Sequence, residues 1–162
     1  MEVHVGKELD EALERRRRKL AREAKEKLLR SVPGVEFLGF DEDPGLPDGR
    51  RACRVGARLD AKFDAQISSE APRAQKEAWL AAQLERARVS GQCVLFTDRD
   101  VPWTRARVEP RAWVPLLEAQ QTRDLLAFGL ESDSKLLHVV DDWHERRLLA
   151  LTLDPKEFIA AS

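Results

Sequence analysis

Apolar and polar residues alternate along residues 53–67. Every odd position is apolar, from Cys53 to Ile67, and every even position is polar or glycine. Because successive side chains of a strand point to opposite faces, this period of two predicts a strand with one buried and one exposed face. The stretch exceeds the usual strand length of roughly 5–6 residues. We therefore expect one long, bent strand, or two strands that meet at a bulge, with Gly56 at the bend.

This alternating stretch is expected to be the central strand of an antiparallel sheet, because clean alternation is typical of a sheet with one solvated face. Its odd positions between Val55 and Phe63 are expected to be buried. The even positions expected to be exposed are Arg58, Asp60 and Lys62. Residues 35–40 form the simplest hairpin partner, across the turn-rich residues 41–49.

Other periodic stretches predict the remaining helices and strands. The expected helices span residues 7–31, 72–89 and 110–122, and the further strands span residues 92–97, 103–108, 125–130, 136–140 and 148–153. The run at 92–97 is continuously apolar, which predicts a strand covered on both faces. Residues 1–5 are expected to be a short strand or a frayed start. Together these elements predict one α+β domain over residues 1–162, with a largely antiparallel mixed sheet of about six or seven strands and about three helices.

The N-terminal helix is heavily charged and has a narrow apolar seam at Leu9, Leu13 and Leu20. The basic run from Arg15 to Lys19 interrupts the seam, so the helix cannot be buried on several sides. We expect it to lie along the sheet or to project as an arm that finds a partner helix. Flanking glutamates offer pairs four residues apart, which favours a solvated, self-paired helix over a nucleic-acid contact.

The composition is that of an ordinary globular domain with a charged surface. Apolar residues make up 43% and charged residues 35%, and the formal net charge is −1, so no global field draws the chain to nucleic acid or anionic lipid. No secretory leader and no membrane-length apolar run is present, which predicts a soluble, cytoplasmic protein. The two cysteines, Cys53 and Cys93, are expected to be buried thiols.

One motif resembles a catalytic site. Pro47-Asp48 is followed by Asp60-Ala61-Lys62, which resembles the PD-(D/E)xK nuclease pattern. That resemblance implies that Asp48 and Asp60 hold Mg²⁺ and that Lys62 positions or activates the attacking water. The alternative is that these residues are surface charges that pair with a neighbouring strand.

A second cluster of polar and aromatic residues lies near the end of the chain. His138, Asp141, Asp142, His144 and Glu145 are of metal-binding types, but their spacing matches no known ligand set. We expect a polar hairpin tip there, carrying Trp143. Trp103 is also placed in or beside a loop among charges, whereas Trp79 and Trp113 occupy core positions on helices. An exposed tryptophan ringed by charge is typical of a protein-binding hot spot. The alternative, which is more common, is that a loop tryptophan simply caps the edge of the core. The predicted partner-binding residues are Trp103, Trp143, Asp141, Asp142, His144 and Glu145.

The sequence thus favours a small binding module without catalytic activity, metal or cofactor. It would be an inhibitor or immunity-type protein, an adaptor or a regulatory subunit. Its partner would be another protein, or a second copy of the chain through the N-terminal helix; nucleic acid is less favoured, and no membrane contact is expected. The alternative is a Mg²⁺-dependent nuclease that uses Asp48, Asp60 and Lys62.

Overall fold

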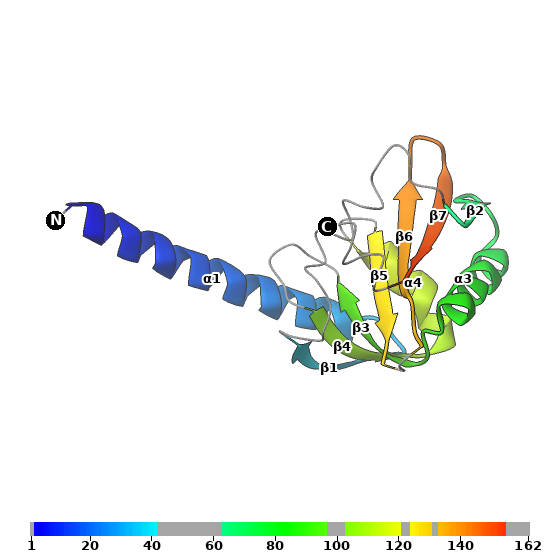
Figure 1. Ribbon diagram of the computed structural model, residues 1–162, viewed down its shortest axis with the longest axis horizontal. Coiled ribbons are helices and arrows are strands. Elements are labelled where there is room, and N and C mark those ends of the chain that lie inside the picture. The colour runs from blue at the N-terminus through cyan, green and yellow to red at the C-terminus, as the bar shows by residue number, and fades with distance from the viewer. Residues whose placement is uncertain (1, 42–62, 97–102, 121–123, 131–132, 155–162) are drawn as a thin grey trace.

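In the part of the chain that the structure describes, seven strands form one antiparallel sheet, and three α-helices pack on it (Figure 1). The computed structural model describes residues 2–41, 63–96, 103–120, 124–130 and 133–154. The strand order across the sheet is β1-β4-β3-β5-β6-β7-β2. The elements are α1 (Glu2–Ser31), β1 (Val35–Asp41), β2 (Ala65–Ser68), α3 (Arg73–Ala87), β3 (Gln92–Phe96), β4 (Trp103–Val108), the 3-10 helix η1 (Pro110–Ala112), α4 (Trp113–Ala119), β5 (Asp124–Gly129), β6 (Leu136–Asp142) and β7 (Arg147–Leu153). The α+β class, the single domain and the long N-terminal helix are as the sequence predicts.

The main core lies between one face of the sheet and the helices. Leu80 and Leu84 of α3 and Leu116 of α4 pack in one cluster with alternate side chains of the strands. The fully buried strand members of that cluster are Cys93, Leu95, Ala106, Val108, Leu125, Ala127, Leu137, Val139 and Ala150. Burying such side chains stabilises the fold by about 1.5–3 kcal/mol for each large aliphatic group.

The opposite face of the sheet carries a second, smaller cluster. Val94, Trp103, Leu126 and Leu136 are buried together there, with Phe128 and Leu153 packed against them. The continuous apolar run in β3 is explained by these two clusters, because Cys93 and Leu95 point to one and Val94 to the other. The prediction of a strand buried on both faces is confirmed.

The last turns of α1 anchor the helix to the sheet. Leu29 is fully buried in the main core, and the Lys25 Nζ donates a hydrogen bond to Gln120 Oε1 at 3.1 Å. The guanidinium of Arg30 lies 5.3 Å from the centre of the Phe37 ring of β1, a cation–π distance. The helix ends at Ser31, and Gly34, with a φ of 86°, provides the turn that Pro33-Gly34 predicts.

The outer part of α1 projects from the domain (Figure 1). Every side chain from residue 5 to residue 20 is exposed. Arg17 and Arg18 each pair with Glu14, at 3.0 Å and 3.8 Å, so Glu14 and Arg18 form one of the pairs expected between residues four apart. We call residues 5–20 the outer arm. Helix extends back to Glu2, so the short strand expected at residues 1–5 is wrong; local helix propensity prevails there because no sheet edge lies beside it.

The described end of the alternating stretch does not lie at the centre of the sheet. Its described end, from Phe63 to Ser68, alternates between half-buried odd and exposed even positions, as predicted. However, β2 pairs with β7 at the edge of the described sheet, and β1 pairs with β4 at the opposite edge. The predicted hairpin between residues 35–40 and this stretch is therefore wrong for the described strands. The remainder, including Cys53 and the positions from Val55 to Lys62, lies outside the described residues.

Two element boundaries also differ from the prediction. The helix expected at residues 110–122 is η1 followed by α4, which ends at Ala119. Pro115 is the third residue of α4, where the missing N–H costs no helical hydrogen bond, so the helix starts late and does not kink there. The turn expected at residues 141–147 is shorter, because Asp142 pairs with Arg147 in the ladder.

Candidate functional site

Trp143 stands at the exposed tip of the β6–β7 hairpin. Its side chain is 60% exposed, and its ring stacks on the imidazole of His144, with 3.8 Å between the ring centres. Glu145 and Arg146, also exposed, complete the turn. The sequence prediction of a polar hairpin tip carrying a tryptophan is confirmed.

The tip is braced by hydrogen bonds to β2 and to the residues that follow it. Arg146 Nη1 donates to Glu70 Oε1 at 3.1 Å, and Arg147 Nη1 donates to Gln66 Oε1 at 3.1 Å. The Ser69 backbone N–H donates to the Arg146 carbonyl at 3.0 Å. The sequence analysis missed Gln66 and Glu70, because only the β2–β7 pairing brings these distant residues beside the hairpin. The brace fixes the turn that presents the indole.

Asp142 holds the base of the turn. Arg147 Nε donates to its Oδ2 at 3.2 Å, and the Glu145 N–H donates to its Oδ1 at 3.4 Å. Desolvation raises the pKa of Asp142, but the hydrogen bonds from Arg147 and Glu145 and the positive charges of Arg147 and His144 outweigh it, so the pKa lies below its usual value. The carboxylate therefore stays ionised near neutral pH.

Asp141 does not belong to the tip. Because β6 continues to Asp142, the two aspartates point to opposite faces of the sheet. Asp141 lines a cavity of about 310 Å³ under α3 and α4. Polar side chains around this cavity include Ser69, Lys76, Glu118 and Gln120, and Lys76 Nζ lies 3.7 Å from Glu118 Oε1. Asp141 is therefore separated from Trp143 and the other exposed residues of the tip, and its partner-binding role stays a prediction.

Trp103 is also not available to a partner. It begins β4 and is only 5% exposed, in the smaller cluster with Leu126 and Leu136. The prediction treated it as a loop tryptophan like Trp143. It is buried because its strand is paired on both sides, with β1 and with β3.

His138 is separate from the other polar residues of its predicted cluster. It is 1% exposed within β6, and its Nε2 lies 3.7 Å from Asp124 Oδ2. Neither ring nitrogen has a hydrogen-bond partner in the part of the chain that the structure describes. Among the described residues, no group of three or more His, Cys, Asp or Glu side chains could hold a metal ion.

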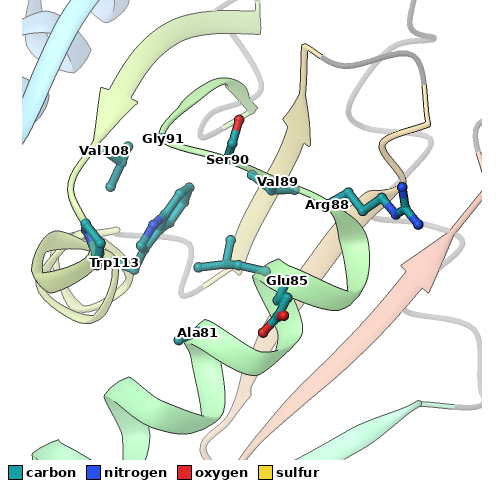
Figure 2. A pocket seen from close by; sticks show the side chains of 10 residues that line it. Ala81, Glu85, Arg88, Val89, Ser90, Gly91, Val108 and Trp113 are labelled. Atoms are coloured by element: carbon teal, nitrogen blue, oxygen red, sulfur yellow. The ribbon is translucent and has the colours of Figure 1, made fainter.

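A second hollow, of about 430 Å³, lies between the end of α3 and Trp113 (Figure 2). Leu84, Val89 and Val108 line it with the indole of Trp113. Two charged residues, Glu85 and Arg88, also line the hollow. Arg88 points away from it in Figure 2 and forms an ion pair with Asp133. A ligand site usually adds several convergent polar groups to an apolar lining. The hollow is concave, but the described residues that line it include no pair of groups suited to acid–base or nucleophilic chemistry.

The nuclease-like residues Asp48, Asp60 and Lys62 lie outside the described residues. Cys93 is fully buried in the main core, and burial raises its pKa to about 12. Its thiol is therefore a core group and not a nucleophile.

The chain matches no family model, no curated protein and no solved structure. None of the helices in the described ranges is long and apolar enough to span a bilayer. The site must therefore be judged on its own geometry.

Proposed function

We propose that the protein acts by binding another protein through the tip of the β6–β7 hairpin, without catalysing a reaction. It would serve as an inhibitor or immunity-type protein, an adaptor or a regulatory subunit. The observation that carries this proposal is the exposed indole of Trp143, held on a braced turn.

A braced tryptophan is suited to binding because its large apolar surface is already ordered. Indole burial supplies much of the energy at protein interfaces, and tryptophan is enriched among the residues that dominate affinity. The bonds of Arg146 and Arg147 to Glu70 and Gln66 fix the turn before a partner arrives. Less conformational entropy is then lost on association.

The carboxylate of Glu145 favours a partner with a basic side chain. Glu145 is exposed beside Trp143, whereas Asp142 is already hydrogen-bonded to Arg147 at the base of the turn. An arginine of the partner could stack on the indole and approach Glu145. We therefore expect a protein surface with at least one arginine or lysine next to an apolar patch.

Site-specific photo-crosslinking in the source cells tests this proposal. A photoreactive residue at position 143 is expected to form an adduct with one protein, whereas the same residue at the exposed Gln75 of α3 is not. With that protein purified, Trp143→Ala is expected to raise Kd at least roughly thirtyfold, the effect of a hot spot of about 2 kcal/mol. Equal adducts at both positions, or no change in Kd, would reject the tip as the binding site.

The same protein should be tested for cleavage of DNA in the presence of Mg²⁺. A binding module leaves plasmid DNA intact. Mg²⁺-dependent cleavage that is lost in Asp60→Asn, with Glu77→Gln on α3 as a matched control, would instead support the nuclease resembled by Asp48, Asp60 and Lys62.

A further inference from the structure

The outer arm of α1 carries a row of exposed apolar side chains. Val5, Leu9, Leu13 and Leu20 are each more than half exposed. With 3.6 residues per turn, all four fall within about 80° of the helix circumference. A projecting helix gains little stability from tertiary packing, so a row of this kind is suited to contact with another helix.

The described part of the domain to which the arm belongs does not cover this row. Leu29, which anchors α1, follows Leu20 by nine residues and therefore points about 180° away from it. The row thus faces away from the sheet, and a helix laid on it would meet no part of the anchoring contact at Lys25 and Leu29.

The charges of the arm are divided into two blocks. The first half is acidic, with Glu8, Asp10, Glu11 and Glu14, and the second half is the basic run from Arg15 to Lys19. Packed helices lie about 8–10 Å apart, within roughly one Debye length at physiological salt. A second arm in the opposite direction would set each acidic block against a basic block, whereas a parallel arm would set the basic blocks against each other.

We propose that two copies of the chain associate through their outer arms, which lie antiparallel with the twofold axis between Glu14 and Arg15. In this register Leu9 of each copy lies opposite Leu20 of the other, and Val5 lies opposite Ala24. Leu13 lies beside Arg16, whose aliphatic stem can cover it while the guanidinium reaches water. The two domains lie on the outer sides of the helix pair.

The flanks of the row agree with this direction. In an antiparallel pair the same flank of both helices meets. Asp10 then lies beside Arg17 of the second copy, and Glu8 lies beside Lys19. In a parallel pair opposite flanks meet, and Arg17 would lie between Arg15 and Lys19 of the other copy. Like charges so placed are destabilising, so the antiparallel arrangement is favoured.

Light scattering and sedimentation across a dilution series test the association. At about 100 µM the protein is expected to have twice the chain mass of 18.4 kDa and to dissociate on dilution, because so short a row supports about micromolar affinity. The variant Leu9→Gln/Leu13→Gln is expected to raise the dimer Kd at least roughly tenfold. The matched control Glu11→Gln/Arg18→Gln changes the far side of the arm with the same net charge, and is expected to change Kd less than about threefold.

Disulfide trapping in a Cys53→Ser background tests the direction. In the antiparallel register two copies of position 9 are about 16 Å apart along the helices, beyond the 4.4–6.8 Å between Cα atoms that a disulfide needs. Leu9→Cys alone and Leu20→Cys alone are therefore expected to remain unlinked, and a mixture of the two is expected to form the mixed disulfide. Trapping of each variant with itself would show a parallel pair and overturn the proposal.

Two further outcomes decide the matter. The proposal is overturned if the chain stays monomeric at 100 µM, or if Leu9→Gln/Leu13→Gln leaves the dimer Kd unchanged. Near-UV circular dichroism serves as the control that the domain of the variant is folded. Trp143→Ala is expected to leave dimerisation unchanged, because the hairpin tip is remote from the arm. Failure of the arm contact is thus separable from failure of the proposed tip contact.

Discussion

The start of β4 and the tip of the β6–β7 hairpin are similar in sequence and opposite in environment. Each carries a tryptophan among charged residues. Trp103 is 5% exposed and Trp143 is 60% exposed. Trp103 belongs to a strand with a neighbour on either side, β1 and β3, whereas Trp143 follows the last ladder pair, Asp142–Arg147. The difference shows that the position of a strand in the sheet, and not the local charge, decides which tryptophan can meet a partner.

The two tryptophans are expected to differ most in their effect on stability. Trp103→Ala is expected to lower the free energy of unfolding by about 3–5 kcal/mol, because it removes a large buried ring and leaves a cavity. Trp143→Ala is expected to change it by less than about 0.5 kcal/mol. Urea unfolding followed by far-UV circular dichroism measures both, and equal losses would show that the comparison is mistaken.

The two ends of α1 show the same contrast between a buried and an exposed side chain within one helix. Leu29→Ala is expected to cost about 2–5 kcal/mol, since Leu29 is fully buried. Leu13→Ala is expected to stay within about 0.5 kcal/mol at concentrations where the chain is monomeric. Thermal unfolding of dilute protein gives both values. A large loss from Leu13→Ala would mean that the outer arm packs on its own domain.

The contrast between a buried and an exposed position can also be measured as the reaction rate of a thiol. In a Cys53→Ser background, Cys93 with its pKa of about 12 is expected to react with iodoacetamide at pH 8 at least roughly a hundredfold more slowly than a cysteine placed by Trp143→Cys. Mass spectrometry of timed samples measures both rates. In unfolding concentrations of urea the two thiols are expected to react alike, and similar rates in the folded protein would contradict the burial of β3.

The smallest effect concerns the base of the tip. Because the pKa of Asp142 is lowered in the folded protein, its carboxylate adds stability at pH values above its unfolded pKa of about 3.9. That stability is lost as the pH falls through the folded pKa. Asp142→Asn is therefore expected to be less stable than the natural protein at pH 7 and to approach it once the pH has fallen through the folded pKa of Asp142. A difference that is independent of pH would assign the effect to packing.

Much of the fold can be read from short-range patterns. The strands at β3 and β4 and the helix at α3 lie within one or two residues of their predicted limits, because hydrophobic period and turn residues act locally. The hairpin tip at Trp143 is likewise marked by its polar sequence. The hydrogen bonds of Gln66 and Glu70 to the tip cannot be predicted in this way, since they depend on the pairing of β2 with β7, which is distant in the sequence.

The sequence by itself determined most of the helix and strand segments, which of their faces are apolar, and that the outer arm is too charged to be buried. Only the tertiary structure decided that β2 lies at the edge of the described sheet and that Trp103 is buried. It also decided that the side chains of Asp141 and Asp142 point to opposite faces of the sheet. The physical reason is that side-chain periodicity is set by backbone geometry over a few residues. Strand order and the length of a ladder instead depend on which distant segments bury their surfaces together.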